Sequence, residues 1–272
     1  MSYLFITFLA VVQGIAEFLP ISSSGHLEVL SQALTRLGAT LPSESLTISL
    51  TLHAGTLFSI LIYYRKTLLE IILKLRIKLV ALLALGTIPA ATFGLIIDKK
   101  FGDILTNLWV IAPCFLITAF LLFLSQNRST RNEAAVEVDS DSSLPLENLT
   151  IAQALIVGFT QAIAVLPGLS RSGSTIAAGL LSGLNQKDAA SFSFLLAIPV
   201  IGGACLIHAV KLLKQGVENF PVAELTFGFI LSFVVGLFAL NWIIGWLQKG
   251  RLSWFSYWLI AASAGTFALA IF

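Results

Sequence analysis

Long apolar runs follow one another along this chain, separated by short polar segments. The hydrocarbon core of a bilayer is about 30 Å thick, so a helix needs roughly 20 residues to cross it. Six runs have that length and carry few charges; they are 46–64, 79–97, 107–125, 190–214, 222–247 and 254–272. We predict that each forms a transmembrane helix.

Two further apolar stretches, 1–28 and 150–184, are broken near their centres by Pro, Gly and Ser. The breaks read LPISSSGH and LPGLSRSGST. Neither can continue an ideal helix, because Pro lacks a backbone N–H and Gly loosens the backbone. Inside a bilayer, broken backbone is tolerated only where protein or a water-filled cavity satisfies its polar groups. We therefore predict two re-entrant helical hairpins, not two further spans.

Residues 126–148 are polar, Ser-rich and acidic, which predicts a solvent-exposed cytoplasmic linker. The linker separates two repeats, 1–125 and 149–272, each a broken stretch followed by three spans. Because three is an odd number, the second repeat enters the membrane in the opposite orientation, which is typical of an inverted-topology repeat. The predicted fold class is an all-α polytopic membrane protein with two re-entrant hairpins and six transmembrane helices.

Composition agrees with a membrane protein. Hydrophobic residues make up 57% of the chain and charged residues 11%, with a mean hydropathy of +0.93. A soluble domain carries about a quarter charged residues. The net charge of +2, without a basic cluster, argues against nucleic-acid binding. Cys114 and Cys205 lie in apolar runs without CxxC spacing, so we expect reduced thiols that bind no metal. The first residues lack the basic region of a cleavable signal peptide, so none is expected.

The loops also predict an orientation. Ten Lys and Arg residues fall on one side of the predicted topology and five on the other, with Arg171 set aside. Cytoplasmic loops carry the excess of positive charge, so both termini are predicted outside. The tryptophans mostly lie near predicted span ends, where anchoring at the membrane interface explains them. They are Trp109, Trp242, Trp246, Trp254 and Trp258.

The first broken stretch concentrates polar side chains, which are costly at membrane depth and usually mark function there. They belong to Gln13, Glu17, Ser22, Ser23, Ser24 and His26, with Gly25 among them. Gln13 and Glu17 share a helix face because they are four residues apart. The serines precede the next helix, whose free N–H groups and dipole favour an anion. In the plainer alternative, the serines only cap that helix and Glu17 lies at the interface.

The second broken stretch holds an Arg in an otherwise apolar run. It contains Gln161, Ser170, Arg171, Ser172, Gly173 and Thr175. The forked guanidinium of Arg171 suits phosphate oxygens, and glycines let backbone approach a ligand closely. With no acidic residue nearby in sequence, Arg171 needs an anion from elsewhere: Glu17 at rest, and a diphosphate during turnover. A purely structural pair between Arg171 and Glu17 is the alternative.

QGIAEFLPISSSGH and LPGLSRSGST closely resemble the two signature motifs of the undecaprenyl-diphosphate phosphatase family, the bacitracin-resistance type. The similarity covers essentially the whole chain. It implies a multi-pass enzyme of the bacterial cytoplasmic (inner) membrane that hydrolyses undecaprenyl diphosphate to undecaprenyl phosphate and inorganic phosphate. Such an enzyme recycles the lipid carrier of cell-wall synthesis and confers bacitracin resistance. The resemblance also implies an active site open to the extracytoplasmic side.

Carried over by position, the resemblance implies that Glu17, Ser23, His26 and Arg171 are catalytic. Substrate-binding roles would fall to Gln13, Ser22, Ser24, Gly25, His53, Gln161, Ser170, Ser172, Gly173 and Thr175. The nucleophile is either Ser23, activated by His26, or His26 itself, and the sequence does not separate them. For His53, a hydrogen-bonded histidine between packed helices is the alternative to a place in the site.

A divalent cation, Mg²⁺ or Ca²⁺, is the one cofactor considered, and no organic cofactor is expected. Many family members have Glu where this chain has Gln13, which weakens the case for paired carboxylate ligands. Glu17 and the amide oxygen of Gln13 are the candidate metal ligands.

Two other functions compete with the phosphatase. Inverted repeats with broken helices also build transporters, so a transporter or flippase of an anionic lipid is the main rival. A structural scaffold would leave the polar residues of both broken stretches unexplained. The expected partners are a polyprenyl diphosphate and membrane lipids, and the choice between a monomer and a homodimer stays open.

Overall fold

The computed structural model describes residues 3–38, 45–100, 106–135, 146, 148–215, 221–247, 249 and 251–272. Eleven helices account for nearly all of these residues. They are α1 (Tyr3–Ala16), α2 (Ser23–Arg36), α3 (Ser45–Tyr63), α4 (Arg65–Leu73), α5 (Ile77–Lys100), α7 (Leu108–Ala135), α8 (Ile151–Ile163), α9 (Arg171–Leu181), α10 (Gln186–Gln215), α11 (Val222–Leu247) and α12 (Ser253–Ile271). The all-α prediction is confirmed for the described residues.

Six of the described helices are long and apolar enough to cross a membrane: α3, α5, α7, α10, α11 and α12. They coincide with the six predicted spans, with ends that differ by a few residues, except that α7 runs on to Ala135. The chain is thus a multi-pass membrane protein. By contrast, α1 and α8 have 14 and 13 residues, too few to cross a bilayer core of about 30 Å.

Two differences from the sequence prediction concern polar segments. Helix α4 was not predicted, because the charges of Arg65, Lys66 and Glu70 mask its apolar positions. Helix α7 runs to Ala135, so the first ten residues of the predicted linker are helical. The backbone N–H of Ser253, at the start of α12, donates to the side chain of Gln126 (3.0 Å). Residues 136–145 of that linker lie outside the described residues.

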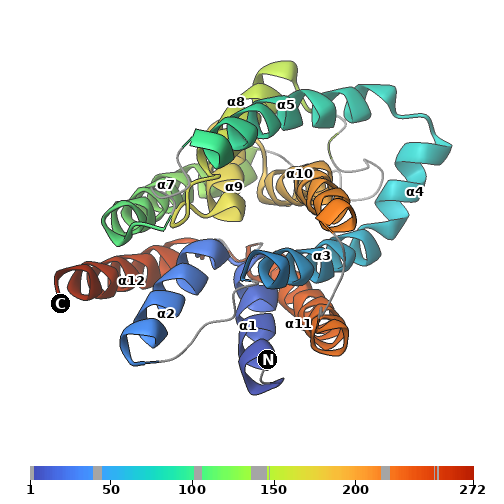
Figure 1. Cartoon of the computed structure of the whole chain (residues 1–272). Coiled ribbons are helices and arrows are strands. Elements are labelled where there is room, and N and C mark those ends of the chain that lie inside the picture. The colour runs from blue at the N-terminus through green and yellow to red at the C-terminus, as the bar shows by residue number, and fades with distance from the viewer. Residues whose placement is uncertain are drawn as a thin grey trace.

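The two halves of the chain exchange helices (Figure 1). Helix α11 from the second half packs on α1 and α3, while α5 from the first half packs on α8 and α10. Helix α7 packs on α9 and along α12. In Figure 1 the orange helix α11 therefore lies beside the blue helices α1 and α3, and the green helices α5 and α7 lie beside the yellow helices α8 and α9. Neither half can bury its apolar faces without the other.

Buried aromatic rings fix the segment that follows α1. Phe18 is fully buried and meets Phe194 of α10 edge to face, with ring centroids 5.8 Å apart. Such pairs contribute about 0.5–1.5 kcal/mol beyond the area they bury. Because Phe18 directly follows Glu17, this contact sets where the carboxylate lies.

Helix α8 approaches α5 so closely that their backbones touch at two glycines. A Cβ on Gly158 would lie 2.5 Å from the carbonyl oxygen of Gly86 and 2.7 Å from its Cα. Those atoms are backbone and cannot rotate away. Only Gly therefore allows this approach, as small residues do at other helix contacts in membranes.

We expect Gly158→Ala to lower the thermal unfolding midpoint of the purified protein in detergent. Overpacking costs about 1–3 kcal/mol, more than the gain in helix propensity from Ala. Gly203→Ala in α10 is the matched control, because no described atom beyond its chain neighbours and its own helix backbone lies within 4 Å of the added Cβ. Its midpoint should stay level or rise. Equal midpoints for the two variants would show that the α5–α8 contact is not tight.

Candidate functional site

The two broken stretches cross each other inside the protein. The backbone N–H of Gly168 donates to Ser22 Oγ (3.1 Å), and Ser172 Oγ donates to the carbonyl oxygen of Leu19 (3.1 Å). All four residues are buried. Helices α2 and α9 begin at this crossing, so their N-terminal N–H groups point towards the same region.

Local sequence explains why the backbone can cross here. Ser22 caps α2 by accepting from the N–H of Gly25 (3.3 Å), in a left-handed backbone conformation with φ of 69°. That conformation costs a non-glycine residue about 1–3 kcal/mol. In the opposite loop Gly168 has φ of 93°, and a Cβ there would lie 2.4 Å from the carbonyl oxygen of Ile111. The strain at Ser22 is offset by the two hydrogen bonds that its hydroxyl accepts from the N–H groups of Gly25 and Gly168.

Glu17 is the centre of a buried polar cluster. Its Oε2 accepts hydrogen bonds from Gln13 Nε2 (2.8 Å) and Ser23 Oγ (3.0 Å). Its Oε1 accepts from a guanidinium nitrogen, Nη2, of Arg171. The ion pair expected between the two broken stretches is present. Only 7% of Glu17 is exposed, so its charge is compensated by protein groups and not by water.

Two buried atoms of this cluster have no hydrogen-bond partner among the described residues. They are Arg171 Nη1 and Gln13 Oε1. Buried polar groups are nearly always paired, and an unpaired one costs about 1–3 kcal/mol, more if charged. One atom is a cationic donor and the other a neutral acceptor, and both belong to side chains that already hold Glu17. The cluster is therefore complementary to a ligand that supplies an anionic oxygen to Arg171.

His53 from α3 adds a fourth contact to the same carboxylate. Its Nε2 lies 3.5 Å from Glu17 Oε2, and its Nδ1 lies 2.8 Å from the carbonyl oxygen of Ser49. The predicted site residue His53 thus does lie at the cluster. Its ring connects Glu17 to the first turns of α3.

His26 is engaged elsewhere. Its Nδ1 lies 2.9 Å from the carbonyl oxygen of Ser22, and its Nε2 accepts from the indole N–H of Trp258 (2.9 Å). Phe115 of α7 meets the imidazole edge to face, at 5.0 Å between ring centroids. Both ring nitrogens are therefore occupied by α2 and α12 instead of by Glu17 or Arg171.

The hydroxyl groups of the second stretch mostly bond to protein. Ser170 Oγ caps α9 through the N–H of Gly173 (3.0 Å) and lies 3.2 Å from Ser172 Oγ. Thr175 Oγ1 donates to the carbonyl oxygen of Arg171 (2.7 Å) and lies 2.6 Å from Ser193 Oγ of α10. These groups hold the start of α9 in place, which fixes the position of the guanidinium.

The remaining predicted residues lie around the crossing. Gly25 approaches the other loop, since a Cβ there would lie 2.7 Å from the N–H nitrogen of Gly168. Gln161 is 1% exposed, and both polar atoms of its amide lack a partner in the described part of the chain. Ser24 is exposed and faces a cavity.

Thr118 was not among the residues predicted from the sequence. It is fully buried in α7, donates to the carbonyl oxygen of Gly168 (3.3 Å) and accepts from the N–H of Ser170 (3.0 Å). Its hydroxyl thus holds the second loop at two positions just before α9. A hydroxyl in the middle of an apolar span was the available signal.

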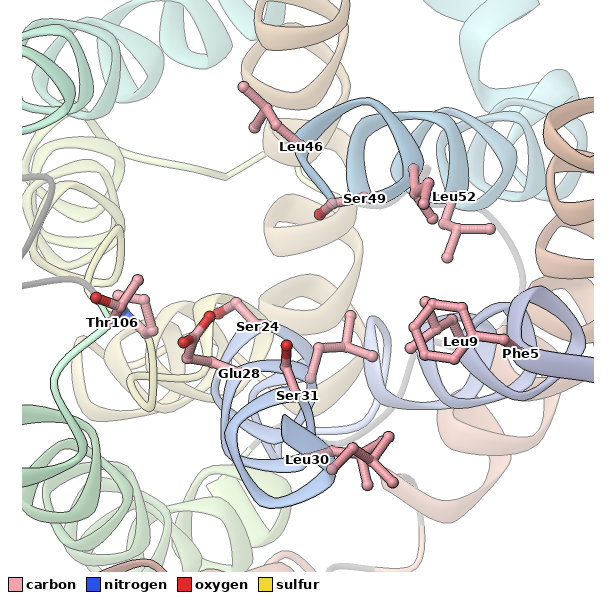
Figure 2. A pocket seen from close by; sticks show the side chains of 14 residues that line it. Phe5, Leu9, Ser24, Glu28, Leu30, Ser31, Leu46, Ser49, Leu52 and Thr106 are labelled. Atoms are coloured by element: carbon pink, nitrogen blue, oxygen red, sulfur yellow. The ribbon is translucent and has the colours of Figure 1, made fainter. Parts of the chain in front are cut away.

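A cavity of about 300 Å³ opens beside the crossing, between α1, α2 and α3. Figure 2 shows Ser24, Glu28 and Ser31 of α2 facing Ser49 of α3, while apolar side chains fill the other side. The apolar lining includes Phe5, Leu9, Leu30 and Leu52. Ser49 lines the cavity and also contacts His53, so the polar side of the cavity lies next to the Glu17 cluster, although no residue of that cluster lines it. It is shaped for an amphiphile with its polar end at the crossing.

No group of three or more His, Cys, Asp or Glu side chains gathers as a metal-binding cluster in the described part of the chain. The donors at hand are the Glu17 carboxylate and the unpartnered amide oxygen of Gln13. A carboxylate and an amide oxygen suit a hard cation that keeps waters or phosphate oxygens as its other ligands. This donor set fits Mg²⁺ or Ca²⁺ in that limited sense.

Comparisons with known proteins agree with the geometry. Residues 6–265 match the family model described as bacitracin resistance protein BacA. An undecaprenyl-diphosphatase of Rhodopirellula baltica is 41% identical over 258 residues, which cover 94% of each chain. Undecaprenyl-diphosphatases of Halothermothrix orenii and Carboxydothermus hydrogenoformans are 36% and 35% identical, with coverage of at least 91% of each chain.

Proposed function

The chain belongs to the family of the bacitracin resistance protein BacA, and we propose that it hydrolyses undecaprenyl diphosphate to undecaprenyl phosphate and inorganic phosphate. The relatives named undecaprenyl-diphosphatase support the substrate. This reaction recycles the lipid carrier of cell-wall synthesis, and its loss would raise sensitivity to bacitracin. The enzyme would lie in the bacterial cytoplasmic membrane with its site open to the extracytoplasmic side.

One observation carries the proposal. Arg171 keeps Nη2 on Glu17 while Nη1 is buried and unpartnered. A guanidinium in that state pairs well with a phosphate oxygen, since charge-assisted hydrogen bonds are about twice as strong as neutral ones. The N-terminal N–H groups of α9 lie next to it and favour the same anion. The terminal phosphate of the substrate is therefore assigned to Arg171.

The first chemical step uses Ser23 as the nucleophile. Its hydroxyl already donates to Glu17 Oε2, so the carboxylate can accept the proton as Oγ attacks the terminal phosphorus. The new bond is Oγ–P, and the bond between that phosphorus and the bridging oxygen breaks. Undecaprenyl phosphate leaves, while Arg171 stabilises charge on the equatorial oxygens.

Water completes the cycle by attacking the phosphorus of phosphoserine, and the Oγ–P bond breaks. Ser23 Oγ recovers its proton from Glu17, and His26 accepts the proton of the attacking water and then passes it to the departing phosphate. His26 suits this role because it lies three residues after Ser23, which places the two side chains on the same face of α2, about one turn apart. If Mg²⁺ or Ca²⁺ binds at Glu17 and Gln13, it would neutralise part of the diphosphate charge.

The proposed fold is an inverted-topology repeat with two re-entrant hairpins. Corresponding helices make corresponding contacts: α1 packs on α11 and α8 on α5, and α3 contacts α11 as α10 contacts α5. Helix α3 also packs on α10, and α7 on α12; in each pair the two helices occupy corresponding places in the two repeats. Ser22 and Ser170 cap their helices in the same way, each through the N–H three residues later. These correspondences support a pseudo-twofold relation between the repeats.

The cavity beside the crossing would hold the first isoprene units of the substrate. We expect Leu30→Trp to raise KM for undecaprenyl diphosphate roughly tenfold with little change in kcat, because the indole fills space needed in both ground and transition states. Leu37→Trp, at the exposed end of the same helix and outside the cavity, is the control and should leave KM unchanged. Equal KM values for the two variants would place the lipid chain elsewhere.

A phosphate-release assay tests the function. The purified protein in detergent should release inorganic phosphate from undecaprenyl diphosphate. Binding of the lipid without any turnover, with or without added Mg²⁺ or Ca²⁺, would contradict the phosphatase and favour the transporter or flippase.

A further inference from the structure

His26 and Trp258 form a contact between helices far apart in sequence. The indole Nε1 of Trp258 lies 2.9 Å from His26 Nε2. The two rings are nearly parallel, at 11°, with centroids 6.0 Å apart. Because the two nitrogens are close while the ring centroids are far apart, the rings meet edge to edge. The indole N–H is therefore directed at the lone pair of the imidazole nitrogen. Trp258 is 54% exposed, so burial in the protein core does not explain the position of its indole.

The two hydrogen-bond partners of His26 define which of its ring nitrogens carries the proton. The carbonyl oxygen of Ser22 can only accept, so Nδ1 of His26 carries the proton in their hydrogen bond. The indole of Trp258 can only donate, so Nε2 of His26 presents its lone pair. Both contacts require the same neutral form, the Nδ1–H tautomer. If Nε2 carried a proton, its N–H and the indole N–H of Trp258 would be two donors facing each other.

We propose that Trp258 is a positioning residue that selects the Nδ1–H tautomer of His26 and keeps its Nε2 lone pair ready to accept a proton. The catalytic consequence rests on the proposed function, because it matters only if His26 accepts the proton of the attacking water. Trp258 holds the lone pair until that water takes its place. The partner of a histidine decides which ring nitrogen can act as a base.

Neighbouring groups agree with this assignment. Phe115 borders the imidazole on the side of α7 and offers no competing donor. Ser22 is held by its cap and by the crossing with Gly168, so its carbonyl group is fixed. Membrane anchoring alone explains an exposed tryptophan near a helix end but does not require its N–H to meet a histidine.

The tautomer is measured by solid-state NMR on protein labelled with ring-¹⁵N histidine, in lipid bilayers at about pH 8, where an ordinary imidazole is neutral. The chain has only three histidines, and loss of one signal pair in His26→Gln assigns the spectrum. We expect a protonated Nδ1 and an unprotonated Nε2 at His26. An Nε2–H tautomer in the unsubstituted protein would overturn the proposal without involving any variant.

Trp258→Phe keeps an aromatic ring and removes only the donor. We expect the ¹⁵N signal of His26 Nε2 to shift because it loses its donor, while the carbonyl oxygen of Ser22 still favours a proton on Nδ1. We also expect kcat to fall about tenfold with KM unchanged, as for other residues that orient a functional histidine. Trp254→Phe, one turn earlier on α12 and also exposed, is the matched control and should change neither. Unchanged ¹⁵N signals in Trp258→Phe, or a rise in kcat, would overturn the proposal.

The two readouts separate this proposal from the proposed function. If the unsubstituted protein releases no phosphate, the phosphatase is wrong, while the tautomer at His26 is still measured. If phosphate is released but His26 carries its proton on Nε2, only the role of Trp258 is wrong.

Discussion

Glu17→Gln is expected to lower kcat/KM for phosphate release by roughly 10³-fold, within the range for loss of a general base. The carboxylate accepts from Arg171, Gln13 and Ser23 at once. An amide offers one acceptor oxygen and two N–H donors, so it cannot satisfy all three groups or take the proton of Ser23. It also leaves the guanidinium without its counter-charge. The measurement is steady-state phosphate release with undecaprenyl diphosphate in detergent.

Glu70→Gln is the matched control, because Glu70 lies on α4 and pairs with Lys74 on a partly exposed surface. Its kcat/KM should stay close to that of the unsubstituted protein. The thermal midpoint of both variants separates lost chemistry from lost folding. Glu17→Gln with full activity would remove Glu17 from the reaction.

Arg171→Ala alone is expected to lower kcat/KM by roughly 10³-fold, as for other arginines that stabilise a transferring phosphoryl group. The substitution removes the unpartnered Nη1 donor and leaves Glu17 buried without its cation. Most of the loss should fall on kcat, because charge on the phosphate oxygens grows towards the transition state. Steady-state kinetics over a range of substrate concentrations separate kcat from KM.

Two controls accompany the arginine variant. Arg171→Lys keeps the charge and loses the fork, so its activity should lie between those of Arg171→Ala and the unsubstituted protein. Arg251→Ala removes an exposed cation far along the chain and should change nothing. If Lys at 171 restored full activity, bidentate geometry at this position would be irrelevant.

Hydropathy predicted the six spans because each run is long and nearly free of charge. In such runs the transfer of apolar side chains from water into lipid dominates every other preference. Helix α4 could not be predicted in the same way, since Arg65, Lys66 and Glu70 interrupt its apolar positions. Its order comes from packing next to α3 and α5. Local pattern thus predicts an element well only where one physical effect dominates.

Parts of the site followed from spacing and charge. Gln13 and Glu17 are one helical turn apart, which places their side chains together, and a membrane arginine without a local anion predicted the pair with Glu17. The contacts of Thr118 with the second loop and of Trp258 with His26 could not be predicted from spacing. Both depend on how α7 and α12 pack against the loops, and no local rule in the sequence encodes that packing.

The proposed mechanism requires Glu17 and Arg171, from opposite halves of the chain, to act as one unit on a single phosphate. A double-mutant cycle of Glu17→Gln and Arg171→Ala, measured by phosphate release, tests this directly. We expect the double variant to lose roughly 10³-fold in kcat/KM, no more than the worse single variant, because either change alone disables the unit. A loss near the product of the single effects, roughly 10⁶-fold, would show that the two residues act independently and would contradict the account.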